Sequence, residues 1–321
     1  METIWRIVKG VASRKWKTAI FSITSACNCR CSMCNIPNLP QISIAPEKGG
    51  KILRQCSKNG VLFLSFTGGE PLLHPSFPSL ARAAKGMGFV IHVASNGTLP
   101  NGVRILKGSV DVMGFSVDSM DPQEHDLNRK HKGAFEKVRR SIQNCRKLGI
   151  KAYANTPPNV YIADKIEEYV EFMNGEWGIP VGFCYPETGN RGYFSTDENI
   201  VSVLSHEKIA EFFRSALKLK KGGYEILNTD VYLREAVEYA KGNFSRVSRC
   251  WAGEGVYWID WHGDVHPCFS KEETLNTCEK WEKYSAEKCN DCFTQCFREP
   301  SSVISNIPSL INELKILRAL S

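Results

Sequence analysis

Thirteen cysteines are the residues of this 321-residue chain with the clearest chemical potential, because they are bunched rather than spread. Four lie between positions 27 and 34, and three lie between positions 289 and 296. An odd number of cysteines cannot pair fully as disulfides, and disulfide frameworks belong mainly to small secreted domains. Clustered thiols in a chain of this size therefore indicate metal ligands.

The first group contains a Cys-x3-Cys-x2-Cys spacing, formed by Cys27, Cys31 and Cys34. Three thiolates on one tight loop can hold three irons of a [4Fe–4S] cluster, whose complete set is four cysteines. The fourth iron would then stay open to a substrate or cofactor. Zinc also binds thiolates, but this spacing directly after a first strand makes zinc the weaker alternative. Cys29 lies off the spacing, so we expect it not to be a ligand.

Polar and glycine-bearing segments follow three further predicted strands. They are Gly68, Gly69, Glu70 and Pro71 after the second strand, Ser95 and Asn96 after the third, and Ser116, Asp118 and Arg129 after the fourth. Functional residues of parallel α/β folds gather at the carboxyl ends of strands. We therefore expect these side chains to lie at one edge with the cysteine loop. Taken alone, Gly-Gly-Glu-Pro would indicate only a turn whose proline opens a helix.

Taken in order, the cysteine loop and these segments resemble the radical S-adenosylmethionine (SAM) superfamily. The resemblance implies that Cys27, Cys31 and Cys34 hold a SAM-binding [4Fe–4S] cluster. It implies that residues 68–71 meet the methionine amino group of SAM. It also implies further SAM contacts, with Ser95 and Asn96 near the ribose, Ser116 near the ribose and carboxylate, and Arg129 on the carboxylate. An arginine suits a carboxylate because its guanidinium binds both oxygens.

Three positions of this region depart from the family pattern or carry a second interpretation. The residue before the third ligand is often aromatic in the family, whereas here it is Met33, whose soft side chain would cover the adenine. The fourth-strand segment resembles sulfatase-maturase-like members, but one extra residue separates Ser116 from Arg129. Asp118 is a candidate SAM contact, and loop capping is the alternative for it and for His125.

The second cysteine group has five well-placed members, Cys250, Cys268, Cys289, Cys292 and Cys296, with Cys278 as a sixth candidate. Residues 257–265 indicate a hairpin with its turn at 262–264, which would bring Cys250 and Cys268 together. This region resembles the SPASM and twitch extensions of radical SAM enzymes, which hold auxiliary [4Fe–4S] clusters. We predict one auxiliary cluster on Cys250, Cys268, Cys289 and Cys292, with Cys296 able to replace one of the last pair. A structural zinc site is the alternative.

Alternating strands and helices must position these residues. The predicted strands are 19–23, 61–66, 89–93, 112–117, 151–155 and 181–184, and the clearest helices are 76–87, 135–148 and 164–175. This alternation predicts a parallel sheet. We expect an α/β fold, a partial (β/α)6 TIM-like barrel with a small C-terminal cysteine-rich SPASM/twitch-like domain. The expected divisions are a basic helix at 1–18, the barrel at 19–200, a helical linker at 201–245, the auxiliary-cluster domain at 246–300 and a C-terminal helix at 301–321.

Composition excludes several other classes of protein. A chain with 42% hydrophobic and 23% charged residues is neither disordered nor fibrous. No apolar run approaches the ~18 residues that a membrane span needs. The charged start lacks a signal-peptide core, so we expect a cytoplasmic protein. Residues 2–17 fit a helix that caps the barrel, which we favour, or one that lies on a membrane surface. The net charge of +7 selects no partner.

The resemblance implies reductive cleavage of SAM to a 5′-deoxyadenosyl radical, which removes a hydrogen from a peptide or small-molecule substrate. It also implies an electron donor such as flavodoxin or ferredoxin, and no nucleic acid is expected. Addition of the adenosyl group, or modification of a lipid or isoprenoid, is an alternative suggested by Glu299-Pro300 after the last cysteines. A zinc-stabilised binding protein is the alternative of another class. Cys56, Cys145, Cys184 and Cys278 are interpreted as buried thiols, although Cys184 would end a strand facing the active site.

Overall fold

The computed structural model describes residues 17–186, 204–271, 273–277, 280–282, 284 and 289–305. Its main feature is an eight-stranded sheet in the order β6-β5-β4-β3-β2-β1-β7-β8. All neighbours in this order are parallel except β7 and β8, which are antiparallel. The strands of this sheet are β1 (Lys17–Thr24), β2 (Val61–Gly68), β3 (Val90–Ser95), β4 (Val112–Ser116), β5 (Lys151–Thr156), β6 (Val181–Phe183), β7 (Val256–Ile259) and β8 (Val265–His266). A separate antiparallel ribbon consists of β9 (Asn276–Thr277) and β10 (Lys280–Trp281).

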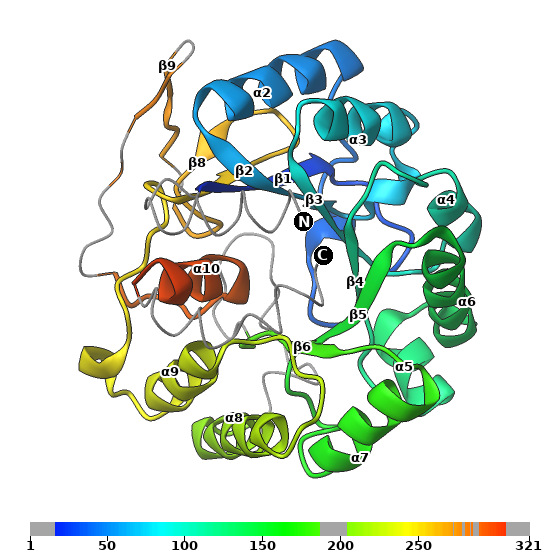
Figure 1. Ribbon diagram of the computed structural model, residues 1–321, viewed down its shortest axis with the longest axis vertical. Coiled ribbons are helices and arrows are strands. Elements are labelled where there is room, and N and C mark those ends of the chain that lie inside the picture. Colours follow the sequence, from blue (N-terminus) through cyan, green and yellow to red (C-terminus); the bar gives the residue numbers. More distant parts are fainter. Residues whose placement is uncertain are drawn as a thin grey trace.

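Helices follow most strands of the barrel. They are α2 (Pro46–Lys58), α3 (Phe77–Gly86), α4 (Pro100–Arg104), α5 (Pro122–Arg129), α6 (Ala134–Leu148), α7 (Ile166–Glu171), α8 (His206–Lys221), α9 (Asp230–Ala240) and α10 (Gln295–Ser305). Shorter helical turns are η1 (Ile36–Asn38), η2 (Pro71–Leu73), η3 (Phe172–Glu176) and η4 (Phe244–Arg246). Helices α2 to α7 surround the curved sheet, and α8, α9 and α10 lie on the side between its edge strands β6 and β8 (Figure 1).

The alternation of side chains explains why the sheet has an outer core and a more polar inner face. In β2, Leu64 and Phe66 are fully buried in the core between strands and helices, whereas Phe63 and Ser65, which alternate with them, are half-buried. Successive strand residues point to opposite faces, so Phe63 and Ser65 face the inside of the barrel. The helices supply matching apolar stripes to the outer face. The core is therefore a shell outside the sheet, and the inner face is left for polar side chains.

The predicted fold class is confirmed. Six parallel strands lie where the sequence predicts them, within about two residues at each end, and the sheet stays open among the described residues. The hairpin of the cysteine-rich region is also present as β7 and β8, with Gly263 at φ +83° in its turn. The sequence did not predict where this hairpin lies relative to the barrel sheet. Strand β7 pairs in parallel with β1, so this hairpin extends the barrel sheet. The pairing satisfies backbone groups of β1 that an edge would leave open.

Several terminal predictions fall largely outside the described residues. The basic segment 2–17 is described only at Lys17, and Cys278 is not described. Of the predicted closing helix 301–321, the first five residues are described, and they form the end of α10, which begins earlier at Gln295.

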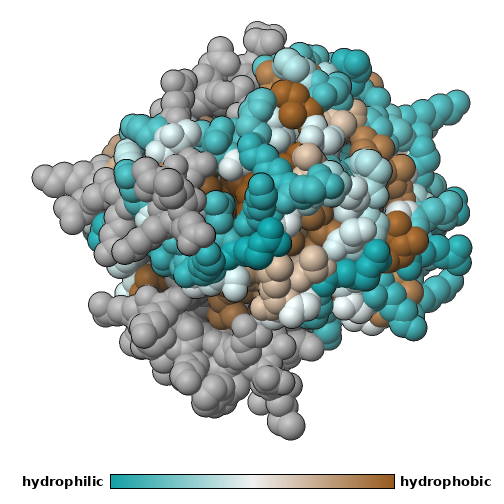
Figure 2. Space-filling model, turned by 90° about the horizontal axis from the view of Figure 1, so that it is seen from above, coloured by the Kyte–Doolittle hydropathy of each residue, from teal (hydrophilic) through white to brown (hydrophobic). Residues whose placement is uncertain are grey.

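Ser76 occupies the N-cap position of α3 but makes no side-chain capping hydrogen bond. No described helix is long and apolar enough to cross a membrane. The described surface in Figure 2 is mostly hydrophilic, with hydrophobic residues in small separate groups.

Candidate active site and a second cysteine site

The first cysteine loop begins directly after β1, at the carboxyl edge of the parallel sheet. Cys27, Cys31 and Cys34 are half-buried, and the Cys34 amide donates to the Cys31 carbonyl at 3.1 Å. The thiol of Cys29 is buried close to the sulfurs of Cys27 and Cys31. A hydrogen bond from Cys29 and the nearby Arg129 guanidinium lower the pKa of Cys31 to about 6. These contacts favour the thiolate of Cys31, which is the form of cysteine that binds metals, whereas burial raises the pKa of Cys34 to about 12.

Gly68 and Gly69 let the end of β2 touch the start of this loop. The Gly69 amide donates to the Thr24 carbonyl at 2.7 Å, and the Glu70 amide donates to the Ala26 carbonyl at 2.8 Å. A Cβ at Gly68 would lie 2.1 Å from the Thr24 oxygen, and one at Gly69 would lie 2.2 Å from the Ala26 oxygen. Neither position has room for a side chain. The two glycines thus fix the Gly-Gly-Glu-Pro segment against the cysteine loop.

Glu70 ties the second strand to the third. Its fully buried carboxylate accepts hydrogen bonds from the Ser95 hydroxyl at 3.0 Å, the Asn96 amide at 2.7 Å and the Leu72 amide at 3.0 Å. Burial raises the pKa of Glu70 to about 7, although these donors favour its charged form. The Asn96 side chain then donates towards the Cys27 sulfur at 3.8 Å. Glu70 therefore acts in this structure as a brace that brings Asn96 to the cysteine loop.

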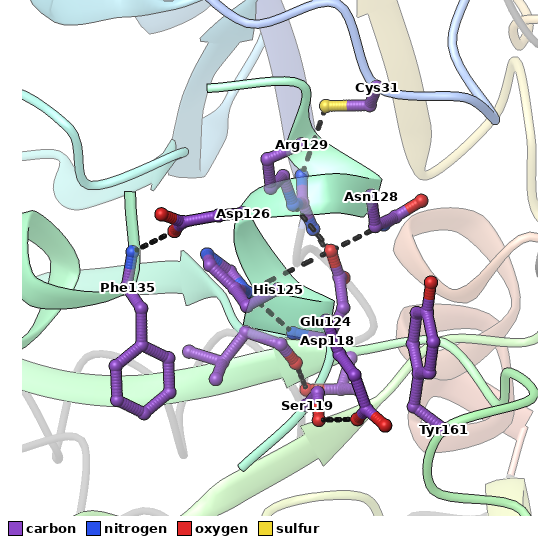
Figure 3. Close-up of polar contacts among 12 residues, drawn as sticks. Cys31, Asp118, Ser119, Glu124, His125, Asp126, Asn128, Arg129, Phe135 and Tyr161 are labelled. Atoms are coloured by element: carbon purple, nitrogen blue, oxygen red, sulfur yellow. Dashed lines mark hydrogen bonds and ion pairs between the residues drawn. The ribbon is translucent and has the colours of Figure 1, made fainter. Parts of the chain in front are cut away.

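Asp118 and Arg129 form a buried, two-pronged ion pair beside the loop (Figure 3). Arg129 Nε donates to Asp118 Oδ2 at 2.6 Å, and Nη2 donates to Oδ1 at 2.5 Å. Asn128 adds a donor to Oδ2 at 2.6 Å. Burial works against the charge of Asp118, but Arg129 and His125 outweigh it and hold the pKa of Asp118 below its ordinary value. The remaining guanidinium nitrogen, Nη1, donates to the Cys31 sulfur at 3.6 Å.

The carboxyl end of α5 is hydrogen-bonded to the backbone of the cysteine loop. The amides of Arg30 and Ser32 donate to the carbonyls of Arg129 and Asn128, each at 3.2 Å. The Ser32 hydroxyl donates to Asn128 Oδ1 at 2.7 Å, and Asn128 Nδ2 donates to the Met33 thioether at 3.4 Å. Helix α5 begins at its N-cap Asp121, whose carboxylate accepts two backbone amides. Asn128 and Ser32 were missed in the sequence because they carry no motif spacing.

Most of the predicted SAM-site residues therefore meet at one edge of the sheet. Those brought to the cysteine loop are Met33, Gly68, Gly69, Glu70, Ser95, Asn96, Asp118 and Arg129. Pro71 is buried at the start of η2, and Ser116 is half-buried at the end of β4, opposite Asn155 of β5. The donor set consists of three thiols with an amide and a guanidinium directed at two of the sulfurs. This set fits an anionic iron–sulfur cluster, because N–H donors to sulfur stabilise its charge.

The second cysteine group lies where β7 joins the barrel. Cys250 and Cys268 are buried in an apolar cluster with Ile20, Trp258 and Phe297, and Cys289 and Cys296 pack against that cluster. Burial raises the pKa of Cys268 to about 12, and the nearby Cys292, Cys250 and Cys289 add to the effect. The four first-choice ligands are thus neighbours in space. Cys296 also lies close enough to Tyr153, on the inner face of the barrel, to affect its pKa.

Arg298 organises the second group, and no motif in the sequence identified it. The side chain is almost fully buried and donates to three backbone carbonyls. Its Nε donates to Cys292 at 3.0 Å, its Nη2 to Cys289 at 2.9 Å and its Nη1 to Ser248 at 3.1 Å. One guanidinium therefore joins the segments that carry Cys250, Cys289 and Cys292.

Within the described residues, no three His, Cys, Asp or Glu side chains are placed to hold a single metal ion.

Comparison with known proteins agrees with this arrangement. The profile of the Radical SAM superfamily matches residues 21–173. An S-adenosylmethionine-dependent nucleotide dehydratase from a Thermoplasmatales archaeon is 31% identical over 44% of this chain, which corresponds to about half of that relative (52%). An AdoMet-dependent heme synthase of Methanosarcina barkeri is 26% identical, over 77% of this chain and 75% of that protein.

Solved structures share the fold over almost the whole chain. Streptococcus suis SuiB bound to S-adenosylmethionine has a TM-score of 0.64 at 18% identity, covering 94% of this chain and 72% of SuiB. SuiB has also been solved bound to the precursor peptide SuiA. At this level of identity the likeness concerns the fold.

The open parallel barrel and the cysteine loop at its carboxyl edge define a radical SAM domain. Residues 21–173 match the radical SAM superfamily, whose cofactors are a [4Fe–4S] cluster and SAM.

Proposed function

We propose that Cys27, Cys31 and Cys34 hold the [4Fe–4S] cluster and that SAM binds beside it at the carboxyl edge of the sheet. The observation that carries this proposal is the convergence on one loop. The ends of β2, β3 and α5 all hydrogen-bond to it, and two of its three predicted ligands receive N–H donors. When bound, the cluster and SAM supply a 5′-deoxyadenosyl radical that removes a hydrogen from the substrate. The chain's own residues position these groups.

The predicted SAM contacts divide into backbone and side-chain contributions. In the segment 68–71 the Glu70 carboxylate is already occupied by three residues of the protein, so we assign the contact with the methionine amino group to the backbone. Ser95 is equally committed to Glu70, and the Asn96 side chain is committed to Asn28 and Thr98, so we assign the ribose to Ser116. Asp118 acts through Arg129 and is a positioning residue. Met33, held by Asn128, is assigned to the adenine.

We further propose an auxiliary [4Fe–4S] cluster on Cys250, Cys268, Cys289 and Cys292. Support comes from their grouping around one apolar cluster and from the single arginine that fixes the two segments that carry three of them. Cys296 remains the alternative ligand. The site adjoins β7, which pairs with β1, so the second cluster would lie beside the strand that leads into the first cysteine loop.

The proposed substrate is a peptide or a small molecule, and the proposed electron donor is a flavodoxin or ferredoxin. The M. barkeri relative, by its name, makes heme, whereas SuiB binds a peptide. Both kinds of substrate should therefore be offered to the reduced enzyme, with tetrapyrroles representing the small molecules. Free 5′-deoxyadenosine together with a modified substrate supports hydrogen removal. An adenosylated product would instead favour the adenosyl-adding alternative.

The assignment of the first cluster is tested by Cys31→Ala, with Cys56→Ala as the matched control. Cys56 is a fully buried thiol on α2 that contributes to neither cysteine group. With dithionite as reductant, Cys31→Ala should lose 5′-deoxyadenosine production, and Cys56→Ala should retain it. Production by Cys31→Ala at the wild-type rate would refute the ligand assignment.

A further inference from the structure

We propose that Arg129 is a positioning residue that raises the reduction potential of the cluster on Cys27, Cys31 and Cys34, by donating a hydrogen bond from Nη1 to the sulfur of Cys31. The inference rests on the proposed function, because it needs that cluster to be present. A cluster gains negative charge when it is reduced. A donor directed at one of its sulfurs therefore stabilises the reduced form more than the oxidised form.

The direction of this donor is fixed by the buried ion pair. A guanidinium is planar and rigid, so holding two of its nitrogens determines where the third points. Asp118 accepts from Nε at 2.6 Å and from Nη2 at 2.5 Å, and Nη1 then meets the Cys31 sulfur at 3.6 Å. Asp118 is itself fully buried and held by Asn128. The direction of the Nη1 donor is thus fixed by the protein before a cluster or SAM binds.

Burial makes this donor effective. Only 10% of the Arg129 side chain and none of the Asp118 side chain is exposed, so solvent screens the contact little. The neighbouring Arg30 offers a contrast on the same loop. It also carries a positive charge next to Cys31 in the sequence, but its side chain is exposed, and its only described hydrogen bond to α5 uses its backbone amide.

This role differs from the one that the family resemblance implies for Arg129. Pairing with the SAM carboxylate would use the two-pronged face of the guanidinium, which Asp118 occupies here. The two roles give different results when SAM is left out. A residue that only binds the SAM carboxylate changes SAM affinity and leaves the potential of the SAM-free cluster unchanged. A residue that donates to Cys31 changes the potential in both conditions.

The test is a redox titration of the anaerobically purified protein without SAM, followed by electron paramagnetic resonance. The signal that is lost in Cys31→Ala identifies the cluster in question. The main variant combines Asp118→Asn with Arg129→Met, which removes the donor while leaving the net charge unchanged and no buried charge unpaired. Arg129→Lys is the second variant, because lysine cannot hold Asp118 with two nitrogens and also reach Cys31. Arg30→Gln is the matched control, and iron and sulfide analysis shows that the cluster is present in each.

Both Arg129 variants should bind the cluster but have a lower potential. The expected shift is about tenfold towards the oxidised form, which corresponds to about 59 mV for a one-electron couple. Arg30→Gln should shift the reduction potential of the cluster much less. The inference is overturned if the Arg129 variants keep the wild-type potential, or if Arg30→Gln shifts it equally. If wild-type protein shows no signal that depends on Cys31, the proposed function fails instead.

Discussion

The two cysteine regions of this chain are each organised by one buried arginine, but the arginines act on different groups. Arg129 is paired with Asp118 and directs its remaining nitrogen at a cysteine sulfur. Arg298 donates to the backbone carbonyls of Cys289, Cys292 and Ser248. The first arginine can therefore influence the electronic state of a bound cluster. The second holds the loops that carry the ligands.

Their charges are also balanced differently. Arg129 has a carboxylate in direct two-pronged contact, with both side chains buried. Arg298 has Glu235 within electrostatic range: burial raises the pKa of Glu235, and Arg298 opposes this shift in part. The Glu235 carboxylate in turn accepts a hydrogen bond from the backbone amide of Ser248. The comparison teaches that the position of the first arginine depends on one ion pair, whereas the second arginine is held by several backbone contacts.

The largest effect is expected from breaking the ion pair. Asp118→Ala leaves Arg129 buried without its partner, and removing one member of a buried pair costs about 3–5 kcal/mol. The free energy of unfolding, measured by denaturant titration of the protein, should fall by that amount. Glu207→Gln is the control, because Glu207 and Arg214 form an exposed pair on α8 that contributes less than about 1 kcal/mol. Equal losses of unfolding free energy in Asp118→Ala and Glu207→Gln would contradict the stabilising role assigned to Asp118.

Arg298→Met should produce an effect confined to the second region. It leaves three carbonyls without their donor, but Ser248, Cys289 and Cys292 are only half-buried. We therefore expect a loss of about 1–3 kcal/mol in total, the penalty for one buried carbonyl without a partner. Iron analysis should show loss of the auxiliary cluster, while the Cys31-dependent signal is kept. Arg298→Lys, which retains the charge but makes fewer contacts, should lie between Arg298→Met and wild type. Loss of both clusters in Arg298→Met would show that the two regions do not assemble independently.

Ser32→Ala should have the smallest effect. It removes a single side-chain hydrogen bond between the cysteine loop and Asn128, which contributes about 0.5–1.5 kcal/mol. The backbone contacts of Ser32 and Arg30 to α5 remain. Thermal unfolding should shift slightly, and the first cluster should still form. A complete loss of iron would mean that the grip of α5 on the loop rests on this hydroxyl rather than on the backbone.

Much of the fold was predictable because its signals are local. Apolar runs of strand length alternate with amphipathic helices, and the carboxyl-edge rule placed the Gly-Gly-Glu-Pro segment beside the cysteine loop. The pairing of β7 with β1 was not predictable, since it joins residues more than two hundred positions apart and depends on which edge is free. The extension of the sheet by the cysteine-rich region therefore emerged only from the structure.

The sequence predicts which cysteines are ligands of the candidate site, but it does not indicate the residues that support them. Cysteine spacing singles out Cys27, Cys31 and Cys34, but nothing in the sequence marks Asn128 or Arg298 as organisers. Asn128 donates to the Asp118 carboxylate and the Met33 thioether, and Arg298 donates to backbone carbonyls, all of which other segments contribute. Glu70 shows the same limit, because its motif suggests a cofactor contact while its carboxylate is used inside the protein.

The central claim is that the two cysteine groups hold two separate clusters. Iron, sulfide and zinc analysis of the anaerobically purified wild type, Cys31→Ala and Cys268→Ala tests it most directly. The account predicts about eight irons in the wild type and a loss of about four in each variant, with the other cluster retained. Stoichiometric zinc in place of iron, or a single substitution that removes iron from both groups, would contradict it.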